Sequence, residues 1–204
     1  GKHFSAGADL NWMKRASAFG EAENLADARR FARMLRALSD MSKPTIARVQ
    51  GAALGGGTGL AAACDMAVAA SDAVFSTSEV KFGIIPSVIS PYVLRAVGPR
   101  HALRFFQSAE RVPAERALAI GLVGEVVAVD ALDAAVAALA ETLISGAPQA
   151  QKAAKDLIAA VTGRPIDDTV SEETAQRIAR QRATEEAKDG ITAFLEKRQP
   201  AWLQ

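Results

Sequence analysis

The stretch that decides the fold is residues 51–60, which read GAALGGGTGL. It follows a short run rich in β-branched residues, 45–50, that predicts a buried strand, and it leads into a small-residue run, 60–64, that predicts a helix. Glycines packed this densely let a ligand approach the backbone, and the start of a helix directs N–H groups at an acceptor. The stretch therefore suits an oxyanion hole made of main-chain amides, or equally a tight turn with close helix packing. Its spacing is not that of a dinucleotide fingerprint, and no Lys-Ser/Thr pair follows it as in a phosphate loop.

The segments on either side predict a parallel α/β core followed by helices. Helical spacing of apolar residues over 24–38 predicts a surface helix, while 66–70 and 74–76 predict further extended segments. Strand, helix and strand joined by short links favour a parallel sheet. We expect later helices over 103–108, 113–120, 132–143 and 150–161, with residues 122–127 extended. The charge-rich stretch 167–188 has so few apolar residues that we expect it to lie across a neighbouring subunit.

Composition narrows the classes of function. The chain has 204 residues, of which 50% are hydrophobic, and a net charge of +1. The near-neutral charge favours neither nucleic acid nor an anionic membrane. His3 and His101 are the only imidazoles, which argues against a histidine metal site, and the single cysteine, Cys64, cannot form an intrachain disulfide. The most apolar stretch, 52–70, contains Asp65 and is too polar to cross a membrane, so we expect a cytoplasmic protein. Because only two histidines are present, we expect carboxylates to move the protons in any reaction.

Two further segments can carry chemistry. Residues 4–10, FSAGADL, form a small-residue bend whose backbone amides can donate to an acceptor, although Asp9 also suits the N-cap of a helix. Residues 78–86, SEVKFGIIP, place Glu79 among apolar neighbours, where burial would raise the pKa of its carboxyl group and suit it to proton transfer near neutrality. The simpler interpretation is a solvated surface pair of Glu79 with Lys81.

In this order and with these sequences, residues 4–10, 51–65 and 78–86 resemble the enoyl-CoA hydratase/isomerase, or crotonase, superfamily. Residues 190–198 are similar to the family's C-terminal end. The resemblance implies an α/β fold, a crotonase-like spiral of ββα units, with a C-terminal helical region used for trimerisation. We place the core at residues 1–125, without the strands that the family has upstream of Gly1, and the helical region at 126–204. A homotrimer or hexamer is expected.

The resemblance also implies roles for individual residues. The backbone N–H groups of Ala8 and Gly56 match the pair that binds the thioester oxygen of an acyl-CoA, and Glu79 matches a catalytic glutamate. No cofactor is expected, because CoA is part of the substrate, and no metal is expected. The positions that match substrate contacts are Ala6, Asp9, Leu10, Gly55, Gly59, Tyr92, Phe194 and Lys197.

Gly59 stands where the standard hydratases of this family have a first glutamate, which leaves Glu79 as the single acid. Residues 7–14, 57–60 and 85–93 resemble the methylglutaconyl-CoA hydratases, so we predict hydration of a branched, 3-methylglutaconyl-CoA-like thioester. A glycine at position 59 is expected to leave room for the branch. The candidates for binding a distal carboxylate are Lys14, Ser90, Tyr92 and Arg95.

Other functions stay open at this stage. The same fold could support enoyl-CoA isomerisation or hydration followed by retro-aldol cleavage. The arginines of the helix over 24–38 suggest RNA binding as an alternative function. The near-neutral net charge and the 5% aromatic content argue against it. A non-catalytic scaffold is a third alternative.

Overall fold

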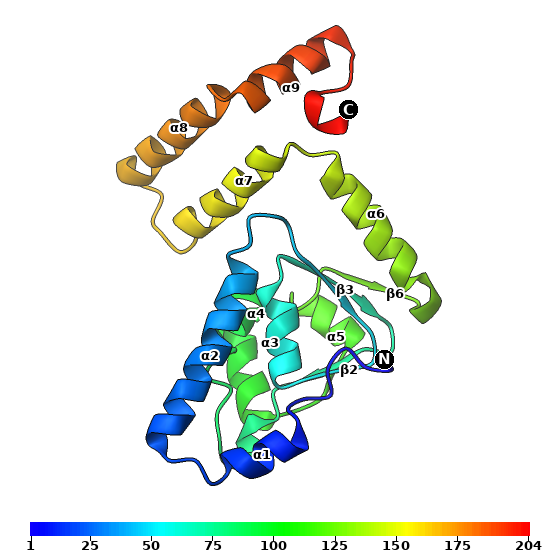
Figure 1. Ribbon diagram of the computed structural model, residues 1–204, viewed down its shortest axis with the longest axis vertical. Helices are drawn as coiled ribbons and strands as arrows, with labels where there is room; N and C mark the ends of the chain where they lie inside the picture. Colours follow the sequence, from blue (N-terminus) through cyan, green and yellow to red (C-terminus); the bar gives the residue numbers. More distant parts are fainter. The chain divides into compact units, whose positions relative to one another are not determined.

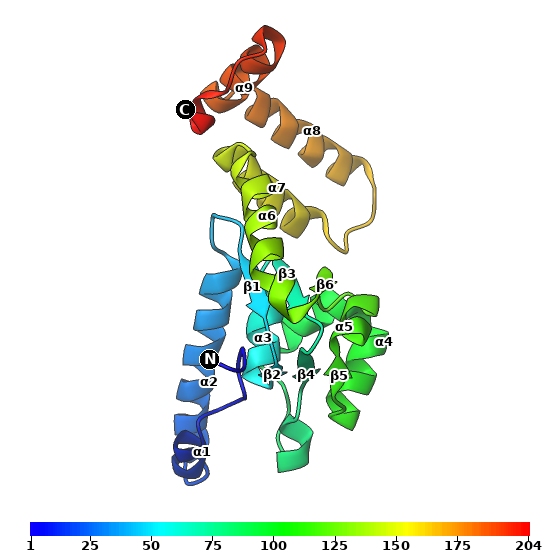
Figure 2. The same cartoon turned by 90° about the vertical axis from the view of Figure 1, so that its right-hand side faces the viewer.

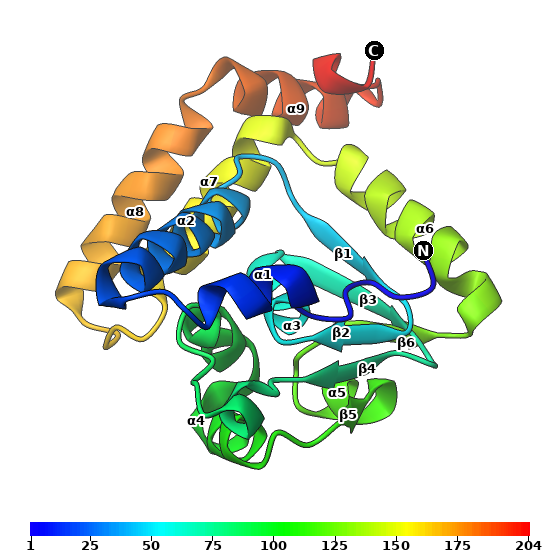
Figure 3. The ribbon, with the colours of Figure 1, turned by 60° about the horizontal axis from the view of Figure 1, so that its bottom comes forward.

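The strands of the protein form two three-stranded sheets, seen in a computed structural model that describes residues 1–204 (Figure 3). In one sheet, β3 (Met66–Ala70) lies between β1 (Ile46–Val49) and β6 (Glu125–Val127), and all three strands are parallel. In the other, β4 (Val74–Ser76) pairs in parallel with β2 (Ala52–Leu54) and antiparallel with β5 (Val112–Pro113). The predicted parallel α/β core is therefore confirmed.

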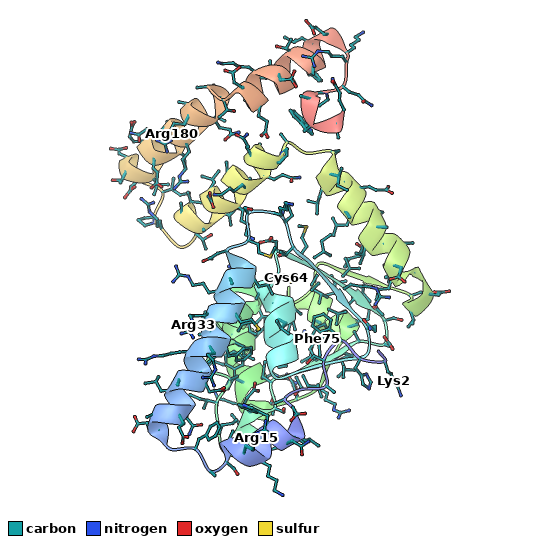
Figure 4. All side chains as sticks on the ribbon, in the orientation of Figure 1. Lys2, Arg15, Arg33, Cys64, Phe75 and Arg180 are labelled. Atoms are coloured by element: carbon teal, nitrogen blue, oxygen red, sulfur yellow. The ribbon has the colours of Figure 1, made fainter.

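Helices pack around the short central helix α3 (Gly56–Ala63). It contacts both α2 (Glu21–Ser39) and α4 (Ser90–Ser108), which lie beside it in Figure 1. All but two of its residues are buried, and the buried residues are all glycine, alanine or threonine. Neighbouring elements can therefore approach the backbone of this helix closely. The core beneath these helices includes the fully buried Phe75, labelled in Figure 4, and Phe105.

Two local predictions at the decisive stretch were wrong. A second strand, β2, stands between the predicted strand and the glycines, and α3 begins at Gly56 rather than at Leu60. Ala52–Leu54 carries no strong strand signal, and glycine disfavours a helix interior by roughly 1 kcal/mol relative to alanine. Pairing of β2 with β4 and burial of α3 outweigh these local preferences.

The remaining elements of this part of the chain follow the predictions with adjusted ends. The helices are α1 (Leu10–Ala16) and α5 (Ala114–Ala119), and 3₁₀ turns occur at Glu79–Phe82 and Val129–Ala131. Helix α4 begins earlier than residue 103 and contains a break at Gly98, whose φ is +70°, followed by Pro99. Cys64 is half-buried against the core.

The chain divides into two compact units, one of residues 1–41 and 45–137 and one of 42–44 and 138–204. The second unit contains the end of α6 (Leu132–Ile144), α7 (Pro148–Val161), α8 (Asp168–Arg182), α9 (Glu185–Glu196) and a 3₁₀ turn at Ala201–Leu203 (Figure 2). The charge-rich stretch is thus two helices, because Thr184 caps α9 by accepting a hydrogen bond from the Ala187 N–H group at 3.2 Å. Within this unit the Glu186 carboxylate accepts hydrogen bonds from the Gln149 and Ala150 N–H groups at the start of α7.

No helix combines the length and the apolar character that a membrane span requires. On α2, two of the arginines considered for RNA binding are ion-paired, one with an acid of the same helix and one with the acid that directly follows it. Arg30 lies 2.7 Å from Asp27, and Arg36 lies 3.1 Å from Asp40. Arg33 projects from α2 on the side away from α3 (Figure 4).

Candidate active site

The register of neighbouring strands brings the three predicted catalytic segments to one edge. Ser5 forms a parallel bridge with Ala53, supported by hydrogen bonds from the Ser5 N–H group to the Ala52 carbonyl and from the Leu54 N–H group to the Ser5 carbonyl, both 2.9 Å. On the other side of β2, Leu54 is paired with Ser76. Residues 8 and 56 lie three positions beyond the paired Ser5 and Ala53, and residue 79 lies four beyond Phe75, the other partner of Ala53. Parallel pairing therefore directs all three segments to the same strand ends.

Gly55 turns the chain from β2 into α3. Its φ is +53°, which favours glycine, and its N–H group donates to the Ser76 carbonyl at 2.7 Å. The next amide, Gly56, opens the helix and donates no hydrogen bond within the protein, and the same holds for Ala8. Both amides predicted to bind a thioester oxygen are therefore available as donors.

Glu79 lies directly against this turn. A Cβ atom placed on Gly55 would be 3.4 Å from Glu79 Oε1, so a carboxylate oxygen sits beside the backbone that precedes the Gly56 amide. The other oxygen, Oε2, is buried and has no hydrogen-bond partner. Burial raises the pKa of this carboxyl group, and a hydrogen bond with the residue's own backbone opposes the shift. The expected direction of the pKa shift is confirmed, although Phe82 and Ile84, two of the predicted apolar neighbours, are mostly exposed.

Three buried hydroxyl groups, which the sequence analysis did not single out, hold this region in place. Thr58 Oγ1 donates across the start of α3, lying 2.7 Å from the Ala53 carbonyl oxygen and 3.1 Å from the Ser76 carbonyl oxygen. Thr77 Oγ1 donates to the Phe105 carbonyl at 3.1 Å, and Ser76 Oγ donates to the Ala109 carbonyl at 3.4 Å. A run of Ser and Thr directly before the candidate acid was the available signal, since hydroxyl groups at such positions need acceptors once buried.

Close packing explains the other glycines of the cluster. A Cβ atom on Gly57 would lie 2.6 Å from Ser5 Cβ, so this glycine allows the first segment to lie against α3. A Cβ atom on Gly59 would lie 2.1 Å from Ile89 Cγ2 and 2.6 Å from Ile89 Cβ. The expectation that Gly59 leaves room for a branched acyl group was therefore wrong, because Ile89 fills that space. The close-packing interpretation holds at Gly57 and Gly59, whereas the oxyanion interpretation stays a prediction for Gly56.

Several predicted substrate contacts have structural roles that the structure makes plain. Asp9 caps α1, accepting a hydrogen bond from the Trp12 N–H group at 2.6 Å, while Ala6 and the largely exposed Leu10 lie on either side of the bend. Tyr92 is half-buried, with the Arg95 guanidinium 5.8 Å from its ring centroid.

The other candidates for a distal carboxylate differ in availability. Ser90 Oγ donates to the Ser87 carbonyl at 2.7 Å, whereas Lys14 lies in the last turn of α1. Phe194 and Lys197 belong to the second unit. Phe194 is 83% exposed on α9, and Lys197 ends that helix with a φ of +55°.

Comparison with known proteins agrees with this arrangement. Residues 1–204 match the family model for Enoyl-CoA hydratase/isomerase. The crotonyl-CoA hydratase of Syntrophomonas wolfei is 38% identical over 203 residues, which cover 99% of this chain and 76% of that protein. The short-chain-enoyl-CoA hydratase of Clostridium acetobutylicum is 36% identical, over 97% of this chain and 74% of that protein. A crystal structure of an enoyl-CoA hydratase from Shewanella pealeana superposes with a TM-score of 0.95 at 46% identity, over 99% of this chain and 76% of that chain.

Proposed function

Because the chain belongs to the enoyl-CoA hydratase/isomerase family, we propose that it adds water across the double bond of an α,β-unsaturated acyl-CoA with Glu79 as its single acid–base group. The observation that carries this proposal is the half-buried Glu79 carboxylate beside Gly55, next to a Gly56 amide that donates to nothing else in the protein. An acid with a raised pKa and nearby free amides are the two components that enolate chemistry requires.

In the proposed mechanism, the thioester oxygen accepts hydrogen bonds from the Ala8 and Gly56 N–H groups. The Glu79 carboxylate takes a proton from a water molecule while the oxygen of that water bonds to C3. The electrons of the double bond move toward the thioester and form an enolate. The two amides stabilise the negative charge on oxygen, a contribution of roughly 3 kcal/mol per donor in comparable sites. Glu79 then returns the proton to C2, so that the product carries the whole water molecule and the enzyme is regenerated. No cofactor takes part beyond the CoA of the substrate.

For the acyl group, we propose a branched thioester of the 3-methylglutaconyl-CoA type. Support comes from the likeness of residues 7–14, 57–60 and 85–93 to methylglutaconyl-CoA hydratases. Because Ile89 packs against Gly59, the lack of a side chain at position 59 does not by itself provide space for the branch of the acyl group. Tyr92 and Arg95 stay candidates for the distal carboxylate, and the Arg95 guanidinium lies 5.8 Å from the Tyr92 ring centroid, within the range of a cation–π interaction.

The test is product identification. The protein is incubated separately with crotonyl-CoA and 3-methylglutaconyl-CoA, and the products are separated and identified by mass spectrometry. We expect 3-hydroxybutyryl-CoA from the first and 3-hydroxy-3-methylglutaryl-CoA from the second, the second at higher kcat/KM. A product of unchanged mass with a shifted double bond would point to isomerisation, and a shortened acyl-CoA would point to cleavage. Recovery of both substrates unchanged would refute the proposed activity.

We also propose that the protein assembles as a trimer or a pair of trimers through its second unit. Ile191, Phe194 and Leu195 are exposed on α9, and burial of such side chains is worth roughly 1.5–3 kcal/mol each. In this assembly Phe194 and Lys197 would contact CoA held by a neighbouring copy. Light scattering coupled to gel filtration measures the mass directly, and a monomer at micromolar concentration would contradict this proposal.

A further inference from the structure

Ile89 lies against α3 one turn beyond the candidate oxyanion amide of Gly56. The Gly59 N–H group donates to the Gly55 carbonyl at 3.2 Å, so these residues occupy successive turns of the helix. Glu79 Oε1 lies 3.4 Å from the position that a Cβ atom on Gly55 would take, and Gly59 is covered by Ile89. The contact of Ile89 with Gly59 therefore lies one helical turn from the carboxylate that performs the proposed chemistry.

The chain between Glu79 and Ile89 is a short connection that returns to α3. It leaves the 3₁₀ turn Glu79–Phe82 at Gly83, whose φ is +73°, and bends again where the Ser87 N–H group donates to the Ile85 carbonyl at 2.8 Å. Ile89 ends the connection directly before α4 and is 2% exposed. The acid and the isoleucine are thus set against α3 by the two ends of one connection.

An acyl chain whose carbonyl oxygen reaches the Gly56 amide and whose C2 and C3 reach Glu79 must pass along this face of α3. Positions 56 and 59 share that face, since residues three apart on a helix are neighbours. The next group met beyond the reacting carbons is then the Ile89 side chain seated on Gly59, because no side chain stands at position 59 itself.

From this placement we propose that Ile89 is a specificity-determining residue, the apolar wall that limits the size of the substituent at C3 of the acyl-CoA. The inference rests on the proposed function for the location of the thioester. Ile89 also packs in the core between α3 and α4, so its test needs a measurement that core packing alone does not change.

The test compares Ile89→Ala with Val93→Ala. Val93 is fully buried one turn along α4 in the same core cluster, and none of the atoms nearest to a Cβ built on the α3 glycines belongs to it, so its truncation removes core packing while leaving the Ile89 side chain on Gly59. Isothermal calorimetry measures the Kd values of two unreactive saturated thioesters, butyryl-CoA and its C3-branched analogue 3-methylbutyryl-CoA. In Ile89→Ala we expect the ratio of the two Kd values to shift on the order of tenfold toward the branched ligand, as expected for one methyl group in an apolar site, and in Val93→Ala we expect no shift.

The milder Ile89→Val replaces Ile89→Ala if the latter fails to fold, with a smaller shift in the same direction. An unchanged Kd ratio in the Ile89 variant, or an equal shift in Val93→Ala, overturns the role of Ile89. Because the saturated ligands need no turnover, a shifted ratio in a protein that hydrates neither enoyl-CoA refutes the proposed function while the role of Ile89 stands. A wild-type protein that binds neither thioester overturns both.

Discussion

The first turn of α3 and the helix α9 are both expected to contact the CoA thioester, yet their surroundings differ. At α3, the roles of Gly55, Gly57 and Gly59 are explained by contacts with Glu79, Ser5 and Ile89 of the same chain. On α9, Phe194 and Leu195 are 83% and 73% exposed, and no contact within the second unit covers them. The difference shows that one chain supplies the packing around the first turn of α3, whereas it leaves these side chains of α9 exposed.

The largest expected effect is on the side of α3. Glu79→Gln keeps the shape of the side chain and removes the proton-transfer group, so we expect kcat/KM for hydration to fall by about 10²–10⁴-fold. Spectrophotometric loss of the enoyl-CoA measures it. Glu110→Gln is the matched control, because Glu110 is ion-paired to Arg104 at 2.8 Å on the surface. Equal activity of the two variants would remove Glu79 from the mechanism.

The next effect separates packing from chemistry within the turn. Gly57→Ala places a Cβ atom 2.6 Å from Ser5 Cβ and 3.1 Å from the Ser5 carbonyl oxygen, so the segment bearing Ala8 must shift. Overpacking of this kind costs about 1–3 kcal/mol of unfolding free energy, and displacement of one oxyanion donor lowers kcat by roughly 10²–10³-fold. Urea unfolding and steady-state kinetics measure the two effects.

Gly20→Ala is the control for this substitution, since nothing lies within 4 Å of a Cβ atom there. Adding Ser5→Gly to Gly57→Ala removes the clashing atom and should restore part of the lost activity. If Gly57→Ala is as active as wild type, the first segment does not supply a donor to the site.

A smaller effect concerns stability against pH. Burial raises the pKa of Glu79 in the folded protein above its value in the unfolded chain. Folded protein then binds more protons between the two values, so the free energy of unfolding falls as pH rises through that window. Glu79→Gln should lack this decline and be the more stable form at neutral pH. Urea unfolding of both proteins across the acidic and neutral range checks it, and parallel curves would contradict the burial of a charged carboxylate.

The smallest effect on the isolated chain is expected at α9. Phe194→Ser removes an exposed ring, so the unfolding free energy of the monomer should change by less than about 0.5 kcal/mol. Light scattering should nevertheless report a loss of assembled protein, with Arg180→Ser, another exposed residue but on α8, as the control. Unchanged mass would place the assembly surface elsewhere.

Much of the fold could be predicted because periodicity and the glycine-rich spacing are local signals. The strands at 66–70 and 74–76 and the helix over 24–38 appear as expected, within a few residues at their ends. Strand β2 and the early start of α3 could not be predicted, because pairing with β4 and burial outweigh weak local propensities. Of the candidate site, the sequence pointed to Glu79 and the glycines but missed Thr58, whose role depends on carbonyl groups of two separate strands.

By itself, the sequence determined the family of this protein and the identity of its single candidate acid, since both are written in residue types at fixed spacing. Only the tertiary structure decided what each glycine does. A missing side chain at position 59 can mean open space or close contact, and the presence of Ile89, thirty residues later, made it a contact. The same is true of the raised pKa of Glu79, because burial depends on which segments fold over a residue and not on its neighbours in the chain.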